Sequence, residues 1–148
     1  MVAGSTVIFL SEPWLAAVVA AANVHPDLPI ALRGLGRDLA AVVEAEPPVL
    51  RRAVAVYGRQ EGGRIAGARV LADPDEIWEL EPAYVVRAPF RVWKALLSGG
   101  DAIQAALSGR VKVQGDLEGL IRRAGYRYIV DAALGSVETE FAEEGASP

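Results

Sequence analysis

The sequence of 148 residues contains no cysteine, one histidine (His25) and one methionine. The absence of thiols excludes a disulfide framework, a thiolate metal site and a cysteine nucleophile. A single imidazole argues against a histidine-cluster metal centre and a proton relay between two histidines. We therefore expect no metal and no other cofactor. Asparagine and glutamine are also scarce, which suggests a thermophilic source as a hypothesis.

Long hydrophobic runs are missing as well. The longest uncharged internal stretch, residues 13–26, contains two prolines, whereas a membrane-spanning helix needs about 20 apolar residues. No basic residue precedes Glu12, so the first residues lack the pattern of a secretory signal. These features predict a cytoplasmic protein without stable membrane insertion.

Basic residues are too few for generic nucleic-acid binding, because the net charge is −4. The charge is unevenly distributed, however. Residues 87–127 contain eight basic and three acidic residues, and the rest of the chain contains seven basic and sixteen acidic ones. The basic segment suggests a surface that faces an anion; uneven solvation of surface helices is the alternative reading.

Alanine is the most abundant apolar residue, with 26 copies against 15 leucines and seven isoleucines. The length fits a single domain spanning residues 1–148 that builds its own core. Because alanine adds apolar surface but little volume, the secondary-structure elements either pack very closely or leave space between them.

The first third of the chain is predicted to be helical over residues 11–46. Ser11 and Pro13 are typical of a helix start, and Asn23 of a stop. Asp27 then caps a second predicted helix, which Pro47 and Pro48 end. Its apolar stripe has helical spacing and consists of Leu28, Leu32, Leu35, Leu39 and Val42.

A sheet with further helices is predicted over residues 49–135. Two alternating stretches, 50–58 and 64–71, flank a glycine-containing turn and predict a hairpin. A third strand is expected at 83–87 and a fourth at 110–114. Helices are expected after Pro89, after Asp101 and from Leu117, with Gly125 as a break before a second helical piece around 126–134, followed by a frayed acidic tail at 142–148. This order predicts an α+β fold with helices over one antiparallel or mixed sheet.

Candidate catalytic motifs are weak. Gly34 and Gly36 are half of a dinucleotide fingerprint but lie in a helical pattern. The residues Asp73-Pro74-Asp75-Glu76 read as a turn with a capping aspartate, and no serine lies in a nucleophile elbow. We therefore expect that the protein is not an enzyme.

One stretch, residues 83–121, resembles the sterol carrier protein 2 family of lipid-transfer domains. The matching segments are Trp93 to Gly99, Ala106 to Gly109, Val111-Lys112-Val113 and Gly115-Asp116-Leu117. A weaker match reaches back to about residue 50. The resemblance implies a five-stranded sheet covered by helices, with an apolar tunnel for an acyl chain, an acyl-CoA or a sterol.

The resemblance implies a pocket between the sheet and the helices at 90–98, 101–108 and 117–124. The expected ligand-binding residues are Trp93, Leu97, Ile103, Leu107, Val113, Leu117 and Ile121. A basic rim is expected to bind an anionic head group, from Arg87, Arg91, Lys94, Arg110, Arg122 and Arg123. We also expect Val111 and Val113 to face inward and Lys112 outward.

These inferences predict a non-catalytic lipid carrier that binds a fatty acid or an acyl-CoA, with a sterol less favoured. The alternative is a ligand-free structural or interaction platform with the same fold, in which the alanine faces pack tightly. A homodimer remains an open expectation under either hypothesis.

Overall fold

The structure, a computed structural model, describes residues 7–8, 10–33, 36–48, 50–98, 100–122, 124–137 and 139–140. The acidic tail predicted at 142–148 lies outside these residues. The elements, with η1 and η2 as 3-10 turns, are β1 (Val7–Ile8), α1 (Glu12–Asn23), α2 (Leu28–Leu32), β2 (Asp38–Glu44), β3 (Val54–Glu61), β4 (Arg64–Val70), η1 (Pro74–Glu76), α3 (Ile77–Leu80), β5 (Tyr84–Pro89), α4 (Phe90–Leu97), α5 (Ala102–Leu107), β6 (Lys112–Gln114), α6 (Leu117–Arg122), η2 (Ala124–Tyr126), α7 (Arg127–Gly135) and β7 (Thr139–Glu140).

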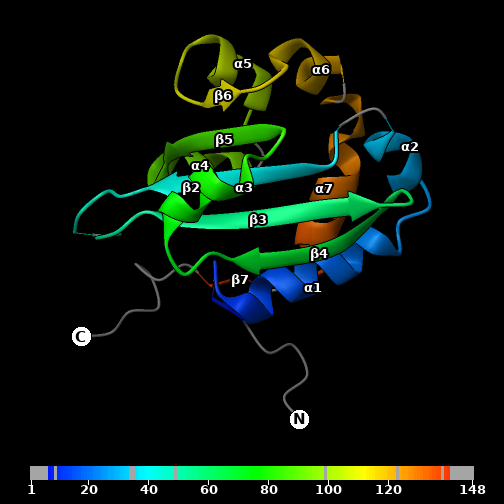
Figure 1. Cartoon of the computed structure of the whole chain (residues 1–148), viewed down its shortest axis with the longest axis horizontal. Helices are drawn as coiled ribbons and strands as arrows, with labels where there is room; N and C mark the ends of the chain where they lie inside the picture. The colour runs from blue at the N-terminus through cyan, green and yellow to red at the C-terminus, as the bar shows by residue number, and fades with distance from the viewer. Residues whose placement is uncertain are drawn as a thin grey trace.

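Five strands form one mixed sheet in the order β4-β3-β2-β5-β6 (Figure 1). Strands β2 and β5 are parallel, and the other neighbours are antiparallel. The predicted α+β class is therefore confirmed. The predicted hairpin is β3 and β4, whose turn residues Gly62 and Gly63 have φ values of 62° and 78°, a left-handed conformation that favours glycine. A separate pair joins β1 and β7 in parallel.

The second predicted helix is wrong beyond its first turns. Helix α2 ends at Leu32, and Asp38–Glu44 is β2, the central strand of the sheet. Gly36 adopts φ 80°, which a helix cannot continue through. Strand β2 has neighbours on both edges and is packed on both faces, so its sequence is a continuous apolar run without alternation. That run also satisfies helical spacing, which explains the error.

The expected cap at Asp27 is wrong: this residue stands at the N-cap position of α2 but makes no side-chain capping hydrogen bond, and its carboxylate accepts from the Tyr128 hydroxyl instead. Three other local helix-start signals are confirmed. The Ser11 hydroxyl accepts a hydrogen bond from the Trp14 amide at 3.3 Å, and Asp101 caps α5 through the Gln104 amide at 3.0 Å. Asp73 forms a capping box with Glu76 in η1. These signals depend only on neighbours in the chain, so sequence alone identified them.

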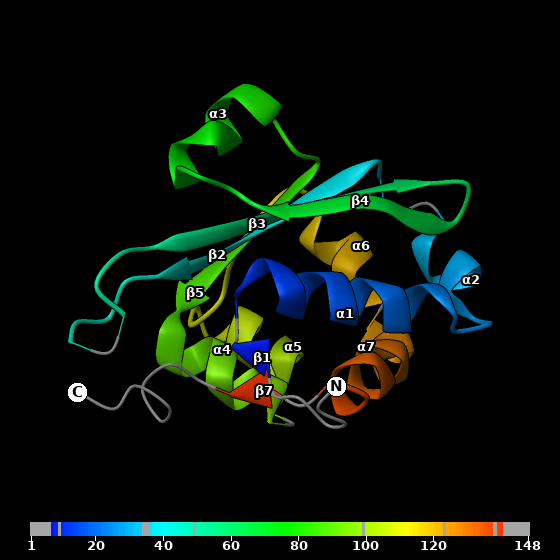
Figure 2. The same ribbon diagram turned by 90° about the horizontal axis from the view of Figure 1, so that it is seen from below.

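Helices cover the two faces of the sheet unequally. Figure 2 shows α1, α4, α5, α6 and α7 on one side and the short α3 on the other. We call these the helix-covered face and the α3 face. On the α3 face, Ala40, Val42, Ala55 and Val85 pack with Leu71 and Ile77. On the helix-covered face, Val43 packs with Trp14, Leu15 and Phe90.

Helix α1 is attached to the outer strand β4 by side chains at both of its ends. Asn23 accepts a hydrogen bond from the Ile65 amide at 2.8 Å and donates one to the Ile65 carbonyl at 3.0 Å. Glu12 accepts from the Val70 amide at 3.1 Å. These contacts satisfy backbone groups that an outer strand would otherwise expose, which protects it from pairing with another chain.

Within the described ranges, no helix is long and apolar enough to cross a membrane.

Candidate functional site

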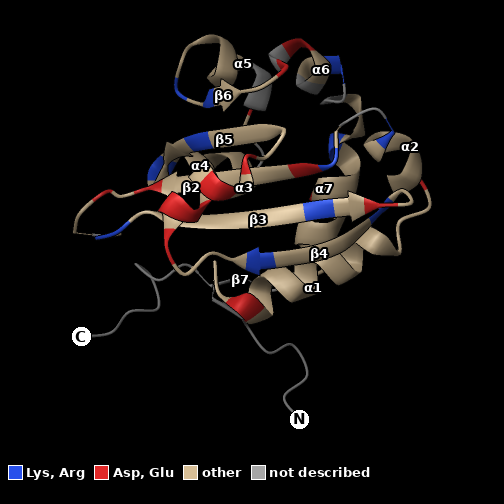
Figure 3. Cartoon of the chain, in the orientation of Figure 1, with Lys and Arg blue, Asp and Glu red and all other residues tan. Residues whose placement is uncertain are grey.

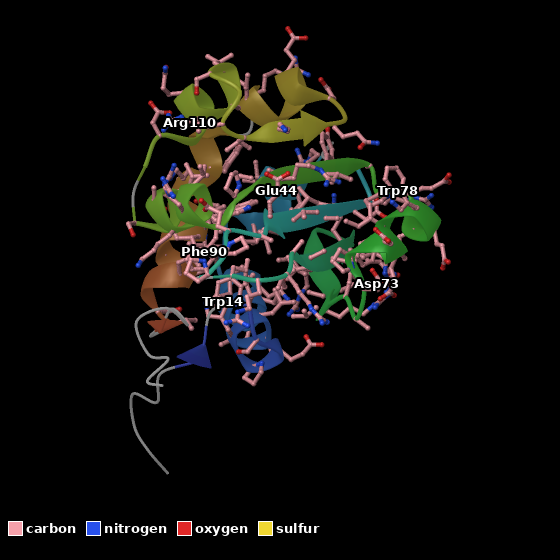
Figure 4. The ribbon with its side chains drawn as sticks, turned by 90° about the vertical axis from the view of Figure 1, so that its left-hand side faces the viewer. Trp14, Glu44, Asp73, Trp78, Phe90 and Arg110 are labelled. Atoms are coloured by element: carbon pink, nitrogen blue, oxygen red, sulfur yellow. The ribbon has the colours of Figure 1, made fainter. Side chains whose placement is uncertain are left out.

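The candidate site is the helix-covered face where β5 and β6 meet α4 and α5. Strand β5 leads directly into α4, and Phe90, the first residue of the helix, is 5% exposed. One turn later, the Trp93 indole donates a hydrogen bond from Nε1 to the Val42 carbonyl at 2.9 Å. This bond fixes α4 across the central strand. Figure 4 shows Phe90 and Trp14 on the helix-covered side of the sheet.

A cluster rich in small side chains lies under α4 and α5. Its buried members are Ala88 of β5, Ala105 of α5 and Val111. Larger, partly buried side chains surround them: Val86, Val92, Trp93, Leu96 and Val113. The close contacts are therefore made by alanine, while the larger apolar groups keep part of their surface accessible.

The same pattern extends along the described part of the chain. Alanine accounts for seven of its nineteen buried apolar residues. Val85 is its largest side chain below 2% exposure, and it belongs to the α3 face. On the helix-covered face, Trp14, Leu15 and Phe90 are buried, whereas Trp93, Leu97 and Val113 are half-buried.

Of the seven predicted ligand-binding residues, four are half-buried, the side chains of two lie outside the described residues, and one is exposed. Trp93, Leu97 and Val113 are half-buried and pack into the helix-covered clusters, and Ile121 is half-buried on α6. The side chains of Ile103 and Leu117 lie outside the described residues.

Leu107 is 66% exposed, which differs from its expected position. Helix α5 turns Ala105 and Ala106 toward the sheet instead, because its helical phase points Leu107 away. The expected strand orientation at β6 is confirmed: Val111 is buried, Val113 is half-buried and Lys112 is exposed.

The predicted basic rim is dispersed over the surface. Arg87 is aligned with Val42 and with Lys112, so it lies on the α3 face, opposite the expected pocket. Arg91 is 3.3 Å from Glu46, and Arg122 is 3.9 Å from Asp116, so each cation lies beside a carboxylate.

Three predicted rim residues remain: Arg110, Lys94 and Arg123. Arg110 is exposed beside α5 (Figure 4), and its Nε donates to the Ser108 hydroxyl at 3.1 Å. Lys94 is half-buried on α4. Arg123 lies outside the described residues. The basic surface is thus shared among several elements.

The opposite face presents an exposed tryptophan on an acidic element. Ile77 is buried against the sheet, whereas the next residue, Trp78, is 70% exposed (Figure 4). Acidic residues dominate η1 and α3 (Figure 3). The hydrogen bond from the Asp73 amide lowers the pKa of the Glu76 carboxyl, and Arg69 lies 3.3 Å from that carboxyl.

One polar residue of the helix-covered face was not among the site residues predicted from the sequence. Tyr84, the first residue of β5, is 6% exposed. The pattern of residues identified a strand here but offered no means of knowing which face the tyrosine occupies. The pairing of Tyr84 with Leu39 and of Val85 with Ala40 settles it, because Ala40 and Val85 belong to the α3 face.

Comparison with solved structures identifies the fold. A sterol carrier protein 2 crystal structure matches at a TM-score of 0.67 and 20% identity, covering 85% of this chain and 97% of its own. A protein of Thermus thermophilus, described as possibly a sterol carrier protein, matches at 0.71 and 19% identity, covering 91% and 94%. Sterol carrier protein 2 from Yarrowia lipolytica matches at 0.56 and 12% identity, covering 90% and 98%. No protein-family model and no curated protein matches the chain. The chain therefore has the sterol carrier protein 2 fold.

Proposed function

We propose that this protein is a non-catalytic carrier that holds the acyl chain of a lipid between the helix-covered face and its helices. The observation that supports this most is the incomplete burial of large apolar side chains there, Trp93, Leu97 and Val113, around fully buried alanines. A carrier needs an apolar site and no reactive group. The matched structures described as sterol carrier proteins have the same fold, which supports a lipid as the ligand. The proposal includes no catalytic residue and no cofactor.

The energetics suit reversible binding. Transfer of about 14 methylenes from water at ~0.8 kcal/mol each contributes roughly 11 kcal/mol. Association costs of ~4–15 kcal/mol offset most of this gain. The balance corresponds to weak or micromolar affinity, which allows a cytoplasmic carrier to release its ligand.

For the head group, we propose a preference for a fatty acid or an acyl-CoA over a sterol. Arg110 and Arg122 are exposed cations near α5 and α6. A guanidinium pairs well with carboxylate or phosphate through its planar fork. Because these cations are exposed, their contribution should weaken with salt, since screening acts over about 8 Å at physiological ionic strength.

Calorimetric titration of delipidated protein with palmitate, palmitoyl-CoA and cholesterol, each at low and high salt, tests both parts. We expect micromolar binding of the two acyl ligands, weakened by salt, and weaker binding of cholesterol. Equal affinities that salt does not change would remove the basic groups from the proposal and leave the apolar site. No heat of binding with any of the three would contradict the carrier function itself.

The second candidate function is a ligand-free interaction platform, in which a homodimer is one outcome. The exposure of Trp78 favours it, because exposed tryptophans are enriched among the residues that dominate protein interfaces. The helix that carries Trp78 is anchored to the sheet, since its residues Ile77 and Leu80 pack against the core. Sedimentation equilibrium of the wild type and Trp78→Ala tests the platform: self-association of the wild type that the variant loses would support it, and a wild type that is monomeric at every concentration would contradict a platform formed by copies of this chain.

A further inference from the structure

The hydroxyl of Tyr84, a buried residue at the start of β5, makes no contribution to the fold described above. We infer that it is the polar anchor of the lipid site, donating a hydrogen bond to an oxygen of the ligand's head group. This inference rests on the proposed carrier function and names the residue that would orient the lipid. The head group it fits is a carboxylate or another acceptor oxygen at the end of an acyl chain.

The first step is placement. Tyr84 is paired with Leu39 and lies two residues before Val86 on β5. Side chains two residues apart on a strand share a face, and Val86 packs beneath α4 and α5. Tyr84 therefore projects into the helix-covered side at the start of β5.

The second step is the backbone that surrounds the ring. A Cβ atom at Gly115 would lie 2.9 Å from the Tyr84 Cδ1 atom, and one at Gly36 would lie 3.4 Å from its Cε2 atom. A Cβ atom at Gly119 of α6 would lie 3.3 Å from the hydroxyl oxygen. Three glycines from different segments thus leave room for the ring, whose hydroxyl oxygen lies beside Gly119 of α6.

The third step is the hydroxyl itself. The tyrosines Tyr57 and Tyr128 donate their hydroxyls to Asp38 and Asp27, each at 2.7 Å. The Tyr84 hydroxyl forms no hydrogen bond with any residue that the structure describes. A buried hydroxyl without a partner costs free energy, and phenylalanine would fill the same space without that cost. A ligand oxygen would satisfy the donor.

The fourth step is the charge nearby. Asp116 also borders the Gly119 position, but its Oδ1 atom accepts a hydrogen bond from the Gly119 amide at 3.0 Å. Its Oδ2 atom lies 3.9 Å from the Arg122 guanidinium. Both side chains are more than half exposed, so solvent screens this pair, and Arg122 places a cation at the same helix. The Tyr84 hydroxyl is a neutral donor beside this pair, and it suits an acceptor oxygen of the head group.

The test compares Tyr84→Phe with Tyr57→Phe as the matched control. Both variants lose one hydroxyl, but Tyr57 lies on the α3 face. Each protein is delipidated, its thermal unfolding is measured without ligand, and palmitate is then titrated. We expect Tyr84→Phe to bind palmitate about tenfold more weakly, as the loss of one hydrogen bond to a charged acceptor predicts, with an unfolding temperature equal to or above the wild type. Tyr57→Phe should keep its palmitate affinity and unfold at a lower temperature.

Two results would overturn the inference while the carrier function stands: equal palmitate affinity of Tyr84→Phe and wild type, or a lower unfolding temperature of ligand-free Tyr84→Phe. The second result would show that the hydroxyl already has a partner within the protein. If the wild type itself binds no palmitate, palmitoyl-CoA or cholesterol, the proposed function fails and the inference fails with it.

Discussion

Replacement of Asn23 by alanine should detach one end of α1 from the outer strand of the sheet. The side chain makes two hydrogen bonds with the Ile65 backbone, at 2.8 and 3.0 Å. Each contributes about 0.5–1.5 kcal/mol, so their loss predicts about 2 kcal/mol. Alanine is the better helix former by about 0.6 kcal/mol, which leaves a net loss of about 1.5 kcal/mol in the free energy of unfolding.

Urea unfolding measures this loss, and hydrogen exchange of the Ile65 amide locates it. Asn23→Asp is the matched control, because its carboxylate still accepts from the Ile65 amide but no longer donates to the carbonyl. We expect the aspartate variant to be intermediate in stability and to keep the Ile65 amide protected. A loss below about 0.5 kcal/mol in Asn23→Ala, smaller than one ordinary hydrogen bond, together with unchanged protection at Ile65, would refute the assignment of Asn23 as the attachment point.

Two further predictions concern glycine and tyrosine positions. Gly115→Ala should lower the free energy of unfolding, measured in urea, by more than about 2 kcal/mol, roughly the cost of a strained backbone plus a steric clash. The reason is that φ is 121° and the new Cβ would lie 2.6 Å from the Ala83 carbonyl oxygen. The control Gly135→Ala, where a Cβ would have nothing within 4 Å, should lose no stability, and equal effects of the two substitutions would contradict the reasoning. The hydrogen bond to Asp38 raises the pKa of Tyr57 above its usual value of 10.0, so its stabilising effect is complete below that pH and is lost as pH rises through the raised pKa. The wild type should therefore lose more stability than Tyr57→Phe as the pH rises above about 10, the ordinary tyrosine pKa, and parallel pH curves would contradict this.

The parts of the fold that sequence predicted correctly depend on short-range signals. Ser11 and Asp101 cap helices through amides three residues away, and Gly62-Gly63 turns the hairpin. Strand β2 was missed because an apolar run packed on both faces also matches a helical stripe. Only the neighbouring strands β3 and β5 decide between the two, and those contacts are distant in sequence.

The candidate site shows the same division. Sequence found the α4–β6 segment and the inward orientation of Val113. The sequence could not show on which face of the sheet Arg87 lies, because the face of a strand residue depends on the register with neighbouring strands. It also treated Arg127 as surface charge, whereas its guanidinium donates to the Leu96 and Gly100 carbonyls. The count of basic residues between 87 and 127 therefore overstated the charge available to a ligand.

The most direct test of the central claim is native mass spectrometry of the freshly purified protein. The carrier account predicts a population heavier than the chain by the mass of one lipid, which disappears under denaturing conditions and yields an acyl-containing molecule on extraction. A spectrum at the mass of the chain alone, unchanged after incubation with palmitate, palmitoyl-CoA or cholesterol, would contradict the account.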